Sequence, residues 1–180
     1  MIKLDRSSKR KVEGQTILIL VECLKGALKA GRFVLNHLYT DKDRVILLQV
    51  YKVQRQGLFL MRNISKILND VSIDELTILK NKLIEEFNIS PFRIQKMAIE
   101  GELAATLKRK FCKGDNPIVV IGEDTQFYQH EIPQKQISTI MKGTCIKNIF
   151  YIDNNITLID NSRILNISDS PEEITEISKN

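Results

Sequence analysis

Three carboxylates stand directly after apolar runs, where they could form a ligand site. Glu22 ends the run 16–22, and Glu123 and Asp124 follow the run 117–122. If both runs are parallel strands of one sheet, these acids meet at its carboxyl edge, where such sheets bind ligands. The pattern predicts a polar crevice, with Glu22 directed towards a ribose hydroxyl, or a Mg²⁺ site, since oxygen ligands suit that cation. The third interpretation is a set of solvated loop acids.

A Mg²⁺ site of the kind found in phosphoacceptor receiver domains needs more than these acids. A receiver also has an acidic pair beside its first strand and a lysine after its fifth. Here the fifth apolar run, 146–152, is followed by Asp153-Asn154-Asn155, which supplies no such lysine. A carboxylate- and Mg²⁺-dependent, receiver-like signalling domain is therefore only the second alternative function for this chain.

The remaining reactive residues are not arranged for catalysis or metal binding. His37 and His130 are the two histidines, and neither has Cys, Asp or Glu at a ligand spacing, so no metal site is predicted. No G-x-S-x-G motif is present to expose a nucleophile. The sequence predicts no catalytic residue and a protein that is not an enzyme.

The three cysteines are Cys23, Cys112 and Cys145, an odd number at wide spacing without a C-x-x-C motif. Such a pattern is typical of reduced thiols in a cytoplasmic protein. Cys112 follows the basic triplet 108–110, but its place at the end of an amphipathic helix favours a structural thiol.

The elements that would carry these residues alternate along the chain. Short apolar runs rich in branched side chains predict buried strands, and apolar residues at steps of three and four predict helices between them. Ser72 and Glu75 have the spacing of a capping box and place a helix start at residue 73, after an undecided stretch 52–72. The expected strands are 16–22, 44–51, 92–99, 117–122 and 146–152, and the clearest helix is 73–88.

This β-α-β order predicts an α/β fold. It is an open doubly wound five-stranded parallel sheet with helices on both faces, of the adenine nucleotide alpha-hydrolase-like type, plus a C-terminal extension. Two further β-type runs, ITLI and RILNI, could form a hairpin around Asp160-Asn161-Ser162. We expect a basic flexible arm over 1–14, the α/β domain over 15–152, and an extension with an acidic tail over 153–180.

The order and composition of these elements resemble those of the universal stress proteins. The first strand ILILVE, the alanine-bearing helix GALKAGRFVLNHL, the second strand VILLQVY, the turn Glu100-Gly101-Glu102 and the fourth strand NPIVVIG all match that family's pattern. The resemblance spans residues 15–152 and implies the α/β fold above. The candidate residues for a nucleotide or other ligand site are Glu22, Val50, Gly122, Glu123, Asp124 and Lys135.

The phosphate loop departs from the family's pattern. ATP-binding members have a glycine-rich stretch after the fourth strand, where small residues let backbone N–H groups approach the phosphates. Here Gly122 is followed by Glu123 and Asp124, and the next glycine is Gly143. Two carboxylates would repel a triphosphate, so ATP binding in the usual manner is not expected. A nucleotide site rearranged around Glu22, Gly122 and Lys135 is the first alternative.

Composition and charge narrow the function classes further. The chain has 180 residues, 43% of them hydrophobic, with a net charge of +5 and a pI near 9.1. Most of the net charge comes from the first eleven residues, and the basic segments lack the interleaved aromatics typical of nucleic-acid binders. No apolar run approaches the roughly 18 residues that span a bilayer. We expect a soluble, cytoplasmic protein that contacts neither membrane nor nucleic acid.

The last strand suggests a partner. In the resembled family it lies at a sheet edge and pairs with its symmetry mate, and here Ile149, Phe150, Tyr151 and Ile152 form an apolar edge. An open edge of this kind favours self-pairing across a two-fold axis. The alternative is that the ITLI and RILNI segments cover this edge within one chain.

Taken together, the residues and the resemblance favour a universal stress protein-like regulatory or binding homodimer. It would act through contact with a partner protein or by sensing a small ligand, without a cofactor; ATP is the cofactor of the nucleotide alternative.

Overall fold

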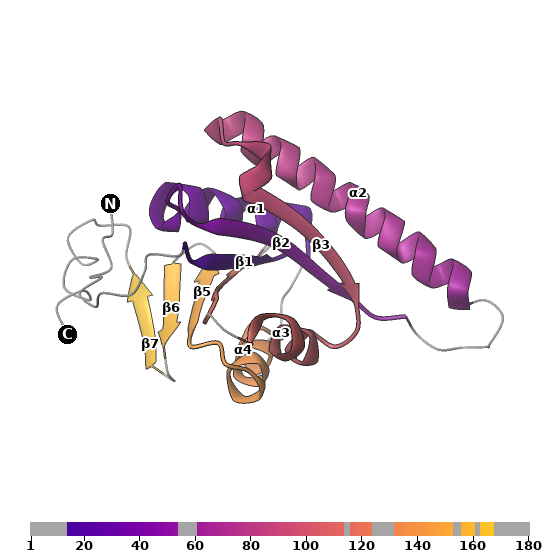
Figure 1. Cartoon of the computed structure of the whole chain (residues 1–180). Coiled ribbons are helices and arrows are strands. Elements are labelled where there is room, and N and C mark those ends of the chain that lie inside the picture. The colour runs from indigo at the N-terminus through magenta and orange to yellow at the C-terminus, as the bar shows by residue number, and fades with distance from the viewer. Residues whose placement is uncertain are drawn as a thin grey trace.

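A computed structural model of the chain describes residues 14–53, 61–113, 116–123, 132–152, 156–160 and 163–167. Its strands and helices alternate as far as the fifth strand, and two more strands follow (Figure 1). The elements are β1 (Thr16–Leu20), α1 (Leu24–Phe33), β2 (Arg44–Tyr51), α2 (Met61–Phe87), β3 (Ile94–Glu100), α3 (Leu103–Phe111), β4 (Ile118–Gly122), α4 (Ile132–Gly143), β5 (Asn148–Ile152), β6 (Ile156–Asp160) and β7 (Arg163–Ile167).

All seven strands lie in one sheet, in the order β3-β2-β1-β4-β5-β6-β7. The first five are parallel, and β6 and β7 are added antiparallel. The central strands β1 and β4 are almost wholly buried because helices cover both of their faces, which explains their unbroken apolar sequences. The predicted doubly wound parallel sheet is confirmed.

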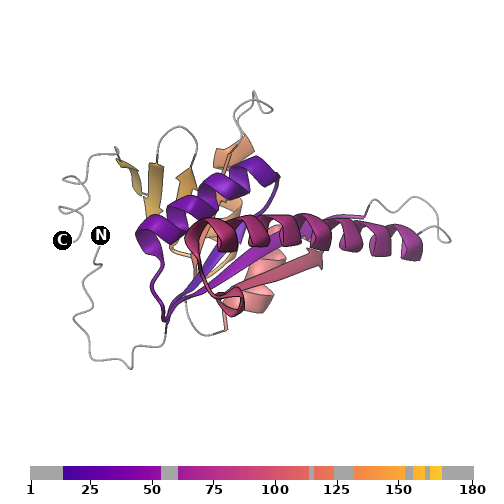
Figure 2. The same cartoon turned by 90° about the horizontal axis from the view of Figure 1, so that it is seen from above.

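The two faces of the sheet carry separate apolar clusters. On one face, α1 and α2 pack against alternate strand residues; Figure 2 shows these two helices side by side over the sheet. On the other face, α3 and α4 pack against the intervening strand residues, such as Leu18 and Val119. The alternation along each strand thus divides the core into two layers.

The helix expected to start at residue 73 is longer than the sequence suggested. Helix α2 runs without a break over Met61–Phe87, so the interpretation of Ser72 as an N-cap is wrong. Ser72 is buried, and it continues the core-facing series of Leu76, Leu79 and Leu83 at helical steps. Its small side chain fits against the core, and its capping preference is overridden by that packing.

The edge of β5 is closed within the chain. Strand β6 pairs with β5 from Asn148 to Ile152, and β7 pairs with β6 in the hairpin predicted around residues 160–162. The expectation that β5 offers an open edge to a second copy is therefore wrong, and the alternative in which the extension covers it is correct. Three of the four residues proposed for that interface, Ile149, Phe150 and Ile152, are buried in the two core clusters.

The hairpin lies outside the domain boundary that the sequence suggested at residue 152, yet it belongs to the same sheet. The expected basic arm covers residues 1–14, and all of it except Gly14 lies outside the described part of the chain. Within the described residues, no helix is both long and apolar enough to cross a membrane.

Candidate functional site

A pocket of about 460 Å³ opens at the carboxyl ends of β1 and β2, between the sheet and the helices α3 and α4. A volume of this size suits a small organic ligand. Its location is the edge at which doubly wound sheets bind ligands. The lining residues are Leu20, Val21, Glu22, Leu48, Val50, Lys52, Glu102, Leu103, Ala104, Thr139 and Ile140.

Local backbone geometry brings the pocket walls together. The N–H of Val21 donates to the carbonyl of Leu48 at 2.8 Å, which holds the ends of β1 and β2 in register beyond β1 itself. Gly101 has φ of 148°, a conformation that favours glycine, and its N–H donates to the carbonyl of Tyr51 at 2.9 Å. This turn directs the chain from β3 into α3, whose first residues Leu103 and Ala104 form one wall.

The charged groups of the pocket lie at its rim. Glu22 is exposed, and Lys52 forms an ion pair with Glu102. The side chains of that pair are 63% and 68% exposed, so solvent screens the interaction and a ligand can displace it at little cost. Two carboxylates against one ammonium leave the rim slightly negative, while the walls are mainly aliphatic.

Two of the residues predicted from the sequence line this pocket, namely Glu22 and Val50. Gly122 has a different position. A Cβ atom on Gly122 would lie 1.9 Å from the carbonyl oxygen of Gly26, and one on Gly26 would lie 2.3 Å from the carbonyl oxygen of Gly122. The two glycines therefore let the start of α1 approach the end of β4, which accounts for a small residue at 122 without a phosphate.

Glu123 is held by a neighbouring strand. Its carboxylate accepts a hydrogen bond from the hydroxyl of Tyr151, and its N–H donates to the carbonyl of Ile152 at 2.8 Å. Tyr151, proposed for a dimer interface, thus anchors the end of β4 to β5. Asp124 and the side chain of Lys135 lie outside the described residues. Among the residues that are described, no group of three His, Cys, Asp or Glu side chains could hold a metal ion.

Sequence reasoning missed the part of the pocket that comes from α3 and α4. Thr139 and Ile140 lie in the middle of α4, far along the chain from β1, and only the fold brings them to the site. Glu102 had one available signal, the Glu100-Gly101-Glu102 turn, because a helix that starts directly after a strand end places its first residues beside the carboxyl edge. Lys52 directly follows β2, so its signal was the end of that strand.

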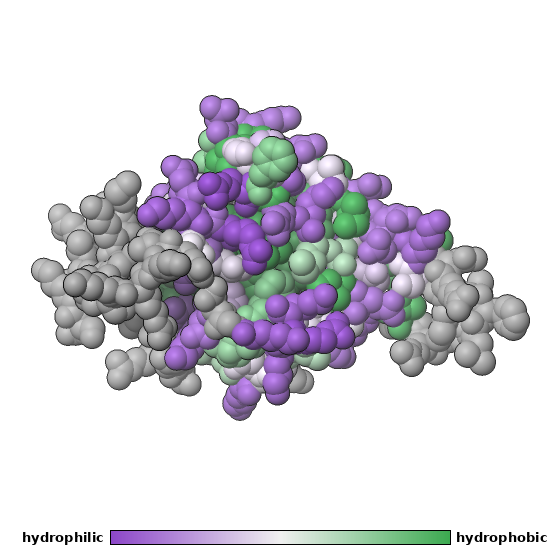
Figure 3. All heavy atoms as spheres, in the orientation of Figure 1, coloured by the Kyte–Doolittle hydropathy of each residue, from purple (hydrophilic) through white to green (hydrophobic). Residues whose placement is uncertain are grey.

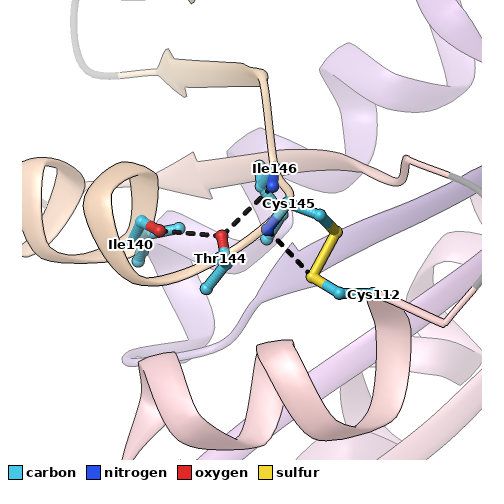
Figure 4. Close-up of a disulfide and its surroundings, with 5 residues drawn as sticks. All are labelled: Cys112, Ile140, Thr144, Cys145 and Ile146. Atoms are coloured by element: carbon cyan, nitrogen blue, oxygen red, sulfur yellow. Dashed lines mark hydrogen bonds between the residues drawn. A yellow bond between two sulfur atoms is a disulfide. The ribbon is translucent and has the colours of Figure 1, made fainter.

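The expectation of three reduced thiols is also wrong. Cys112, at the C-terminal end of α3, and Cys145, just before β5, form a disulfide with a Cα–Cα distance of 5.4 Å (Figure 4). Of the three cysteines, only Cys23 is free, and its Sγ accepts from the N–H of Gly26 as the N-cap of α1. The pairing joins residues 33 apart in the sequence, which no short motif signals.

Comparison with solved structures identifies proteins of similar fold. Hypothetical protein PH0823 matches with a TM-score of 0.55 at 14% identity, over 77% of this chain and 95% of its own. Hypothetical protein MJ0577, the subject of a structure-based assignment of biochemical function, matches with a TM-score of 0.50 at 15% identity, over 79% of this chain and 97% of its own.

No family model and no curated protein matches the sequence. At these identities the structural likeness concerns the fold and extends over nearly all of both neighbours. It supports the doubly wound α/β fold of this chain.

Proposed function

We propose that this protein is a universal stress protein-type regulator that binds a small ligand in the pocket between β1, β2, α3 and α4, without turnover. The observation that carries the proposal is the pocket of about 460 Å³ at the carboxyl edge of the sheet, with aliphatic walls and polar groups confined to the rim. Aliphatic walls bind by excluding water and supply no acid–base pair, which fits a binding role better than a catalytic one.

The pocket chemistry selects the class of ligand. A flat ring system fits between the aliphatic side chains of Leu48, Val50 and Leu103. The carboxylate of Glu22 at the rim can accept hydrogen bonds from ligand hydroxyls. The net negative rim disfavours a triphosphate, and Gly122, the last residue of β4, is packed against Gly26 and not open to a phosphate. A neutral nucleoside-like molecule meets these conditions better than ATP does.

The experiment that tests this proposal is a calorimetric titration with adenosine, and separately with ATP and Mg²⁺. Adenosine should bind saturably and ATP more weakly. Ala104→Phe should abolish adenosine binding because its ring would fill the pocket. Ala105→Phe is the matched control, since Ala105 is the next residue of α3 and is exposed. Equal loss of binding in both variants, or none in either, would contradict the assignment of the pocket.

The alternative function is binding of an adenine nucleotide through a rearranged phosphate loop. It would need groups from residues 124–131, which lie outside the described part of the chain. The same titration separates the two, because tighter binding of ATP than of adenosine favours this alternative.

We also propose that the regulator is a homodimer and passes its ligand state to a partner protein in the cytoplasm. Because β6 covers β5, a second copy that extends the sheet would pair with β7 or with β3, the strands at the two ends of the described sheet. The mass of the protein in solution tests the dimer.

A further inference from the structure

The disulfide joins the two helices that wall the pocket. Cys112 caps the C-terminal end of α3, and Cys145 follows the C-terminal end of α4 by two residues. Both helices cover the same face of the sheet and contribute pocket residues, Ala104 from α3 and Ile140 from α4. The bond therefore fixes one end of each pocket wall relative to the other.

Hydrogen bonds beside the disulfide join the end of α4 to the segment that follows it (Figure 4). The N–H of Cys145 donates to Sγ of Cys112 at 3.0 Å. The hydroxyl of the adjacent Thr144 donates to the carbonyl of Ile140 at 2.7 Å and accepts from the N–H of Ile146 at 3.1 Å. Ile140 lines the pocket, and Thr144 is the residue next to Cys145. The hydrogen bond between Thr144 and Ile140 therefore links the disulfide end of α4 to the pocket wall across one helical turn.

This bond is not needed as a staple for the core. Two apolar clusters fill both faces of the sheet, and domains of this size fold without disulfides. Both cysteines are partly exposed, and Lys108, Arg109 and Lys110 in the last turn of α3 favour the approach of an anionic thiolate. A partly exposed disulfide beside cationic groups is of the kind that thiols reduce, which suits a redox-sensing role.

We propose that the Cys112–Cys145 disulfide is a redox control of the pocket, an inference that rests on the proposed function of that pocket. A thiolate of a dithiol reductant attacks one of the two sulfurs and forms a mixed disulfide. The second thiolate of the reductant then resolves it, so that two electrons and two protons end on Cys112 and Cys145 and the reductant leaves as its own disulfide. The oxidised form holds α3 and α4 in the binding arrangement, and the reduced form binds ligand more weakly.

The test compares oxidised and dithiothreitol-reduced protein by hydrogen exchange and by adenosine titration. Alkylation and mass measurement verify the redox state: one thiol, Cys23, reacts in the oxidised form and three react in the reduced form. Reduction should speed exchange over residues 137–146 and leave residues 72–87 of α2, on the opposite face, unchanged. Adenosine affinity should fall about fivefold or more, the scale of typical coupling between sites.

Two variants serve as controls. The double variant Cys112→Ser with Cys145→Ser should match the reduced protein without any reductant. Cys23→Ser should follow the wild-type protein in both redox states, because serine retains an acceptor at the N-cap of α1.

The outcomes separate this inference from the proposed function. If adenosine binds neither form but exchange over 137–146 still rises on reduction, the proposed ligand class fails and the coupling of the disulfide to the pocket wall stands. If exchange over 137–146 is the same in both forms, the inference is overturned whatever binds. It is also overturned if adenosine binds both forms with equal affinity.

Discussion

At the scale of single residues, Gly26 and Gly122 mark a close approach of the backbones of α1 and β4. Each glycine faces the carbonyl oxygen of the other, and a Cβ on either would lie inside van der Waals contact. Backbone atoms cannot move aside as a flexible side chain does. The sequence drew attention to Gly122 as a remnant of a phosphate loop, whereas the structure gives it a packing role between β4 and α1.

We predict that Gly122→Ala destabilises the protein by about 2–3 kcal/mol, because the added methyl group overpacks against the backbone of Gly26. Urea unfolding followed by circular dichroism measures the change. The matched control is Gly143→Ala, where the new Cβ would lie 3.6 Å from the Cβ of Ala104, an ordinary contact. Replacing this glycine should leave stability unchanged or raise it by about 0.5 kcal/mol. A Gly122→Ala variant as stable as Gly143→Ala would refute the packing role.

At the scale of elements, helix α2 shows where local signals and packing disagree. Its buried side is marked by Ser72, Leu76, Leu79 and Leu83, and this series extends through the position that the sequence assigned to a cap. A second stripe exposes Ile64, Ile67, Val71 and Ile78, which blurred the amphipathic pattern of the first half of the helix. Figure 3 shows apolar side chains interspersed with hydrophilic ones on the face of the molecule that it presents.

Substitutions at Ser72 distinguish a helix interior from a helix start. Ser72→Pro should cost about 3 kcal/mol or more, because proline removes a backbone hydrogen bond inside α2. Ser72→Ala should change stability by no more than about 0.5 kcal/mol, since alanine favours helix interiors. A helix beginning at residue 73 would give the reverse, tolerating proline and losing about 1 kcal/mol with alanine. Thermal unfolding of the two variants decides between these patterns.

The elements that the sequence predicted well are those whose own residues determine them. Strand β2 occupies 44–51 as predicted, because a short apolar run rich in branched side chains favours a buried strand in a layered fold. The candidate site was only half predictable. The positions of Glu22 and Val50 follow from the strand ends. Thr139 and Ile140 reach the pocket only because α4, which comes much later in the chain, packs on the same face of the sheet.

At the scale of the whole molecule, the two added strands change how the sheet ends. A five-stranded parallel sheet would stop at β5 and expose its backbone groups, the edge through which the sequence predicted a dimer. Here the antiparallel hairpin moves that edge outward to β7, with β5 paired on both sides. A hairpin needs only a tight turn, so a short extension suffices to cover a strand that a parallel neighbour could reach only through a long crossover.

Removing the hairpin should therefore expose a strand that favours self-pairing. A chain ending at residue 152 loses β6 and β7, leaves the backbone of β5 open, and should form larger species than the full chain does at the same concentration. A chain ending at residue 167 keeps all seven strands and is the matched control, with the oligomeric state of the full chain. Light scattering coupled to size exclusion measures both. If the chain ending at 152 stays folded with the mass distribution of the full chain, the hairpin does not act as an edge cover. If both truncations form larger species than the full chain, residues 168–180 are the ones that limit association.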